Sequence, residues 1–179
     1  MPRPDFTSCA SSIPEIIRVN HAGEYGAQRI YRGQLKFTRD AHNCSIIKEM
    51  LKQEEVHLSY FTKKLVERRI RPTLLMPLWH IAGYALGAAS ALLGNKTAMI
   101  VTKSVEEVIE QHYQKQIDYL QDFPKEKALL DNIKQFQLDE IEHKDIAVEH
   151  ESDKAMLANL TSKVIKLICN LAISLSKKI

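Results

Sequence analysis

Two stretches of this sequence, Gln53-Glu54-Glu55-Val56-His57 and Asp139-Glu140-Ile141-Glu142-His143, decide which fold it is expected to adopt. Each carries a Glu-x-x-His pair, and residues three apart on a helix point to the same side, where the two side chains can hold one metal ion together. Apolar residues recur around both pairs with a period of about 3.6, which is typical of a helix with one buried face. No stretch of the sequence alternates apolar and polar residues strictly enough to predict a strand. We therefore expect an all-α protein.

Prolines and glycines indicate where the helices begin and end. Ser12-Ile13-Pro14-Glu15 has the form of a capping box with a proline in the first turn, which predicts a helix start. The four helices of the expected bundle span residues 14–40, 43–68, 95–121 and 125–151, and a basic C-terminal helix follows over 154–179. A chain of 179 residues has the size of one domain, so we expect residues 1–179 to form a single domain.

Both Glu-x-x-His pairs fall on the helix faces that should be buried. Glu54 and His57 lie within the apolar stripe of one helix, and Glu140 and His143 lie within that of another. An ionised carboxylate among apolar residues is costly enough to change its protonation state or to destabilise the fold, and a bound cation removes that cost. The alternative is an ordinary bundle in which the glutamates are solvated and the histidines are hydrogen-bonded core residues.

A further glutamate stands about one helix length before each pair. Glu24 precedes Glu54 by 30 residues, and Glu106 precedes Glu140 by 34. Periodicity selects Glu106 rather than Glu107 as the inward residue, because Glu107 shares its face with charged and amide side chains. Four helices are thus expected to bring together four carboxylates and two imidazoles, those of Glu24, Glu54, His57, Glu106, Glu140 and His143.

The charge and chemistry of this set indicate two metal ions. Two divalent ions neutralise four carboxylates, and mixed oxygen and nitrogen ligands with open positions suit iron or manganese. Zinc prefers fewer, tetrahedral ligands, and calcium does not choose imidazole. His112 and Tyr113 lie near Glu106 on the same expected helix and are candidates for contacting the ligands from behind or carrying electrons. For His112, a core histidine bonded to a carbonyl is an equally good interpretation, and His42 and His150 are expected at the surface.

Residues 74–93 contain no charged side chain. Three interpretations are open for this apolar crossover segment: a buried core helix, a helix lying in a membrane interface, and a membrane-spanning helix, although a proline and modest hydrophobicity argue against the last. The flanking basic residues resemble the rim that anionic headgroups attract; they are Arg68, Arg69, Arg71 and Lys96.

The composition excludes several classes of protein. A net charge of +3 is too small to argue for a nucleic-acid partner, and 45% apolar with 26% charged residues is ordinary globular usage. Three cysteines without a Cys-x-x-Cys spacing are typical of a reduced, intracellular protein that has no thiolate metal site. The first residues, MPRPDFTS, have the features of neither a secretory nor a transit signal.

Five motifs are more specific together than any is alone: Asn20-His21-Ala22-Gly23-Glu24-Tyr25-Gly26-Ala27, Gln53-Glu54-x-x-His57, Arg71-Pro72-Thr73-x-Leu75-Met76-Pro77-Leu78-Trp79, Val105-Glu106-Glu107 with His112-Tyr113, and Glu140-x-x-His143-x-Asp145. In this combination, over roughly residues 14–179, the chain resembles the demethoxyubiquinone hydroxylase family of ubiquinone biosynthesis. All six candidate ligands match positions at which that family binds iron, and the start of the chain resembles the bacterial form.

The resemblance implies a ferritin-like bundle, peripheral to the membrane, that uses O2 and two iron ions per chain to hydroxylate the demethoxyubiquinol ring. The implied partners are a polyprenyl quinol, O2 and the membrane surface. The implied location is the cytoplasmic side of the cell membrane, and the chain is compatible with a homo-oligomer or with an accessory lipid-binding protein as a further partner. The apolar segment and the basic C-terminal helix are then candidates for membrane docking. Two alternatives stay open: a ferritin-like iron-oxidising or iron-binding protein without an organic substrate, and a structural or membrane-interaction bundle without metal.

Overall fold

The computed structural model of the chain describes residues 12–149 and 155–178. These residues form six α-helices and one short 3-10 helix and contain no strand, which confirms the all-α prediction. The elements are α1 (Ile13–Phe37), α2 (Ala41–Glu67), α3 (Met76–Leu92), α4 (Asn95–Leu120), η1 (Pro124–Glu126), α5 (Lys127–Glu149) and α6 (Ala155–Lys178). The expected boundaries agree with these to within three residues.

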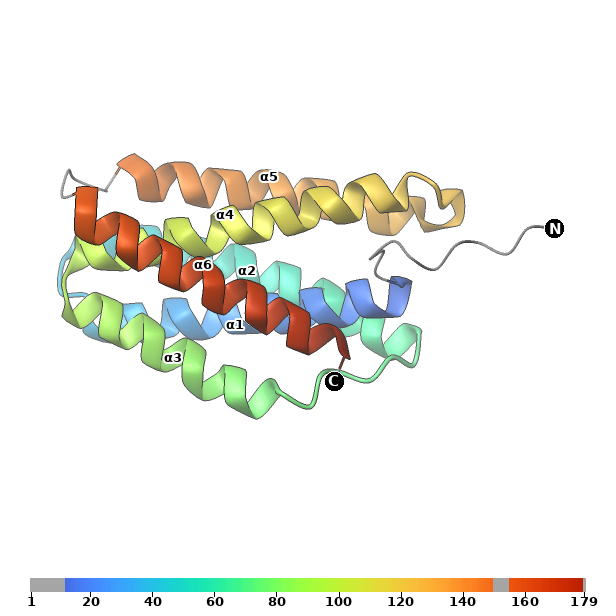
Figure 1. Cartoon of the computed structure of the whole chain (residues 1–179), viewed down its shortest axis with the longest axis horizontal. Helices are drawn as coiled ribbons and strands as arrows, with labels where there is room; N and C mark the ends of the chain where they lie inside the picture. The colour runs from blue at the N-terminus through green and yellow to red at the C-terminus, as the bar shows by residue number, and fades with distance from the viewer. Residues whose placement is uncertain (1–11, 150–154, 179) are drawn as a thin grey trace.

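Four helices, α1, α2, α4 and α5, form a ferritin-like bundle, and the other two cover one side of it (Figure 1). α1 packs against α2, and α4 packs against α5, so the chain builds the bundle from two helix pairs. α3 lies along α1, and α6 crosses obliquely between α3 and α4 (Figure 1). The two additional helices therefore lie on the α1 and α4 side, and α2 and α5 form the opposite side.

Local hydrogen bonds explain where the first two helices begin. The backbone N–H of Ser12 donates to the Glu15 carboxylate at 2.9 Å, as the capping-box motif predicts. Asp40 caps α2, because its carboxylate accepts a hydrogen bond from the Asn43 backbone N–H at 2.8 Å. The expected end of the first helix at Asp40 is therefore too late: α1 stops at Phe37, and Asp40 belongs to the start of the next helix.

The apolar segment folds as α3 and meets α1 through glycines. A Cβ placed on Gly87 would lie only 1.9 Å from the Ile30 carbonyl oxygen, so the two backbones are in direct contact there. The opposite side of α3 faces solvent, with Leu78, Ile81 and Leu92 exposed by 51%, 69% and 67%. A fully buried core helix is thus the wrong interpretation of this segment. Among the described helices, none combines the length and the hydropathy that crossing a membrane requires.

Candidate metal centre

The structure brings the six candidate ligands together at the middle of the bundle. Glu24 lies on α1, Glu54 and His57 on α2, Glu106 on α4, and Glu140 and His143 on α5. Every one of these side chains belongs to a residue that is at most 1% exposed. Each helix contributes its ligands from its inward stripe, so helical periodicity alone places them in the core.

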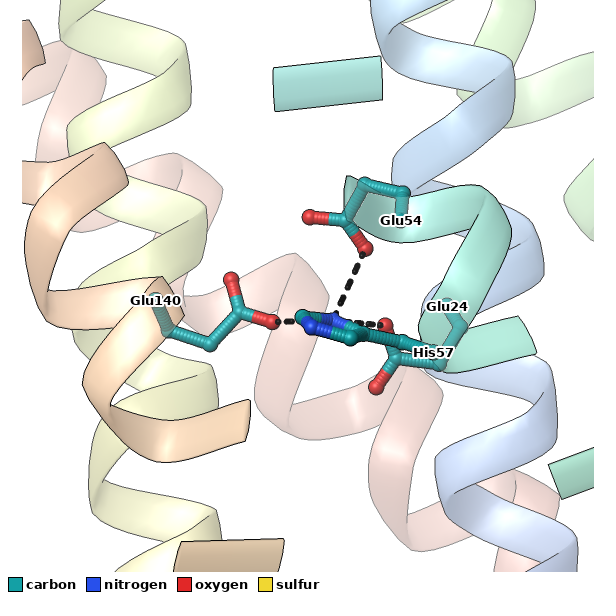
Figure 2. Close-up of side chains that lie close together, drawn as sticks. All are labelled: Glu24, Glu54, His57 and Glu140. Atoms are coloured by element: carbon teal, nitrogen blue, oxygen red, sulfur yellow. Dashed lines mark ion pairs between the residues drawn. The ribbon is translucent and has the colours of Figure 1, made fainter. Parts of the chain in front are cut away.

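Glu24, Glu54 and Glu140 surround His57 (Figure 2). The His57 Nδ1 atom lies 3.3 Å from Glu140 Oε1, 3.5 Å from Glu24 Oε2 and 3.9 Å from Glu54 Oε2. Figure 2 shows the three carboxylates pointing toward the imidazole from three helices. These four residues could hold one metal ion.

A second group forms around His143 and shares two carboxylates with the first. The His143 Nδ1 atom lies 3.3 Å from Glu54 Oε1 and 3.4 Å from Glu140 Oε2, and Glu106 completes the group. Glu54 and Glu140 therefore each present one oxygen to His57 and the other to His143. Glu54 and Glu140 would thus be shared by the two groups if each held an ion, and Glu24 and Glu106 would each belong to one group.

Hydrogen bonds on the far side of both imidazoles orient them. The His57 Nε2 atom lies 2.9 Å from Asp139 Oδ2, and the His143 Nε2 atom lies 2.5 Å from Gln53 Oε1. A carboxylate can only accept a hydrogen bond, so the Nε2 of His57 donates, and the same tautomer of His143 lets its Nε2 donate to the amide oxygen. In the neutral imidazole each Nδ1 then has its lone pair on the inward side, among the carboxylates, where an ion can take the place of a proton.

Two tyrosines hold the end carboxylates across the bundle. Tyr31 on α1 donates its hydroxyl to Glu106 Oε1 on α4 at 2.5 Å, and Tyr113 on α4 donates to Glu24 Oε1 on α1. Each tyrosine follows the glutamate of its own helix by seven residues, two turns, yet bonds the glutamate of the other helix. Tyr113 was among the expected neighbours of the site. Tyr31 falls on the same helix face as Glu24 but was given no role, although the repeated Glu-x6-Tyr spacing is a signal that could have assigned one.

The inward atoms of this site have no hydrogen-bond partner. Eight such buried atoms belong to the six residues: one carboxylate oxygen each of Glu24 and Glu106, both oxygens of Glu54 and of Glu140, and the Nδ1 atoms of His57 and His143. Leaving a buried polar atom without a partner costs about 1–3 kcal/mol, more for a charged group. The donor set fits metal ions, because all eight atoms face the same space and all are oxygen or nitrogen ligands.

Without metal, this site holds protons, for different reasons on its carboxylates and its imidazoles. Burial raises the pKa of Glu54 and of Glu106 well above the usual value, and the charge of Glu140 adds to the effect. Burial also acts to raise the pKa of Glu140, but hydrogen bonds from His143 and His57 outweigh burial and lower this pKa to about 2. Burial lowers the pKa of His57, but its contacts with Glu140 and Glu24 raise that pKa overall to about 12. Metal binding must therefore displace protons.

The remaining residues singled out by the sequence lie around this centre. Glu107 is half-buried and pairs with Lys166 of α6, so Glu106 is the inward residue, as periodicity predicts. The His112 Nε2 atom lies 2.7 Å from the side-chain amide nitrogen of Gln116, so its hydrogen-bond partner is this amide rather than a carbonyl. Burial is the main cause that lowers the pKa of His112 to about 3, and the positive charge of Lys177 is a smaller one. His42 is exposed, as expected. His150 lies outside the described residues.

Comparisons with known proteins agree with this geometry. The family model described as "Ubiquinone biosynthesis protein COQ7" matches residues 11–176. The chain is 45% identical to the 3-demethoxyubiquinol 3-hydroxylase of Rhodospirillum rubrum, over 98% of this chain and 82% of the relative. It is 45% identical to the mitochondrial NADPH-dependent 3-demethoxyubiquinone 3-hydroxylase of Rattus norvegicus, over 94% of this chain and 78% of the relative. It is 37% identical to the mitochondrial 5-demethoxyubiquinone hydroxylase of Saccharomyces cerevisiae, over 95% of this chain and 79% of the relative. This chain therefore belongs to the COQ7 family of ubiquinone biosynthesis proteins.

Proposed function

We propose that this chain is a monooxygenase that hydroxylates the ring of a demethoxyubiquinol, with O2 and two iron ions per chain bound by the six residues of the metal centre. The observation that carries the proposal is the set of eight unpartnered inward atoms, which form two overlapping groups with two shared carboxylates. The names of the relatives support the substrate class. Iron supplies the O2 and electron-transfer chemistry that amino-acid side chains lack.

The protein's own residues prepare this site. Tyr31 and Tyr113 occupy one oxygen of each end carboxylate, which leaves the other oxygen, on Glu106 and on Glu24, for an ion. The apolar side chains around the ligands exclude water: Phe136, for example, stacks on His57 with ring centroids 4.1 Å apart. A dry, pre-arranged site strengthens every electrostatic interaction within it.

We also propose that the outer surface of α3 and α6 docks on a membrane, because a quinol with a polyprenyl tail is held in the bilayer. Beside the exposed leucines of α3, α6 exposes Leu160, Leu167 and Leu171 by 62%, 71% and 57%. The indole of Trp79 on α3 donates a hydrogen bond to Ser176 on α6 at 3.0 Å, so the start of α3 and the end of α6 are in contact. An apolar surface of this extent indicates an interaction site.

The basic rim of this surface differs from the one expected. Arg68 forms a two-fold ion pair with Glu126, at 2.9 Å and 2.6 Å, so its charge is already matched within the protein. Arg69, Arg71 and Lys96 are exposed, and α6 adds lysines near its C-terminal end. These cations support the proposed contact with anionic headgroups, and the proposed location is the cytoplasmic side of the cell membrane.

A single experiment tests the proposed reaction. The chain is loaded anaerobically with Fe(II) and given demethoxyubiquinol and O2, and the quinone product is analysed by mass; because relatives are named NADPH-dependent, one arm includes NADPH. We expect a product heavier by one oxygen atom, which carries the label when ¹⁸O2 is used. Consumption of O2 and oxidation of iron without a hydroxylated product would instead support the iron-oxidising alternative.

A further inference from the structure

The two halves of the metal centre use the same kinds of ligand, but different residues bond the two imidazoles from behind. Each half has a glutamate held by a tyrosine from across the bundle, two shared carboxylates, and an imidazole that faces them through Nδ1. The residue just before the glutamate of each Glu-x-x-His pair bonds the histidine of the opposite pair. Asp139 on α5 reaches His57 on α2, and Gln53 on α2 reaches His143 on α5.

The difference lies in the charge of these two residues. Asp139 is a carboxylate, whereas Gln53 is a neutral amide. A hydrogen bond from an imidazole N–H to a carboxylate makes the other ring nitrogen a stronger electron donor than does a bond to an amide. Gln135 donates to the second oxygen of Asp139 at 3.0 Å, which holds the carboxylate in its place beside His57.

We propose that the two metal positions are unequal, and that Asp139 is the positioning residue that makes the His57 position bind a divalent ion more tightly and fill first. The inference rests on the proposed function, because it assumes that the six residues bind two ions. It follows from the matched ligand types: each position has one tyrosine-held glutamate, two shared glutamates and one histidine, and the residue behind each histidine differs in charge. Replacing the hydrogen-bond partner of a metal-binding histidine typically weakens metal affinity by about 10–100-fold.

The test is a titration of the full, metal-free chain with Co(II) alone. Calorimetry and visible absorption monitor the binding. For the wild-type chain we expect two ions in two steps of different affinity. Asp139→Asn keeps the shape of the side chain and removes its charge, so it should weaken the tight step by about 10–100-fold and leave the weak step nearly unchanged. Gln53→Glu is the converse variant and should strengthen the weak step.

Asp139→Glu serves as the rescue, because it restores the charge, and it should recover much of the tight step that Asp139→Asn loses. If Asp139→Asn proves too unstable to titrate, Gln53→Glu and the wild-type chain still decide the matter. Equal affinities in the wild-type chain, or a loss in Asp139→Asn that is shared by both steps, would overturn the inference while leaving the two-metal proposal in place. A wild-type chain that binds no Co(II) would instead overturn the proposed function.

Discussion

Replacing Gly87 by alanine should destabilise the protein, whereas the same replacement of Gly23 should stabilise it. Both glycines lie inside helices, Gly87 in α3 and Gly23 in α1, so alanine brings the same gain in helix propensity to each, about 0.8–1.0 kcal/mol. Their surroundings differ. A Cβ on Gly87 would lie 1.9 Å from the Ile30 carbonyl oxygen, whereas a Cβ on Gly23 would meet no atom within 4 Å.

The size of the effect follows from this contact. Ordinary contact begins near 3.4 Å, so α3 must retreat from α1 by about 1.5 Å to admit the methyl group of Gly87→Ala. Overpacking costs about 1–3 kcal/mol, and the upper end applies here because the obstructing atoms belong to helix backbone. After the gain in propensity, Gly87→Ala should lose about 2 kcal/mol of unfolding free energy and Gly23→Ala should gain about 1 kcal/mol.

Thermal unfolding of the two variants, followed by circular dichroism under the same metal and salt conditions, measures the difference. For a chain of this length, about 3 kcal/mol between the variants corresponds to about 6–12 °C in Tm. The reasoning is refuted if Gly87→Ala melts at or above the temperature of Gly23→Ala, because the α1–α3 contact would then not be as close as the structure shows.

Four further predictions concern the metal centre and the membrane. In the metal-free chain the folded pKa values of Glu54, Glu106 and His57 lie above their unfolded values, so the stability that their protons provide is lost as pH rises. This loss begins above pH 4.5 for the two glutamates, and for His57 it extends from pH 6.5 toward pH 12. The metal-free Tm should therefore fall between pH 6.5 and 9, and a Tm that is flat or rises would contradict this. Fe(II) at 100 times the Kd of each of the two sites should add about 2.7 kcal/mol of unfolding free energy per site, or about 5.4 kcal/mol for both, which raises the Tm, measured anaerobically, by about 11–22 °C. Glu106→Ala should abolish hydroxylation and reduce bound iron, whereas Glu107→Ala, which removes only an ion pair with Lys166, should keep the iron content; equal iron loss in both would count against the assignment. Replacing Ile81 and Leu167 by aspartate should reduce pelleting with anionic vesicles and the turnover of long-tailed quinols, but should not reduce the turnover of a short-tailed analogue. The control is Val66→Asp, at an equally exposed apolar position on α2. Unchanged vesicle binding would remove the docking proposal.

Part of this protein could be predicted from its sequence because it depends on one helix at a time. The positions of the helices follow from proline, glycine and capping residues, and the inward direction of Glu106 rather than Glu107 follows from the 3.6-residue period. The convergence of the six acid and imidazole side chains follows from the same rule, applied to four helices that must all bury their apolar stripes. Their role as iron ligands stays a proposal.

The rest depends on how one helix is set against another, and no single-helix pattern contains that information. The crossed bonds of Tyr31 and Tyr113, and the reach of Asp139 and Gln53 to the opposite histidines, require the axial register of helices that are far apart in the sequence. The side of α3 that faces solvent was equally undecided, because a charge-free segment has little contrast between its faces. Tertiary packing of the glycine face of α3 onto α1 decided it, since only side chains as small as hydrogen allow two helix backbones to approach so closely.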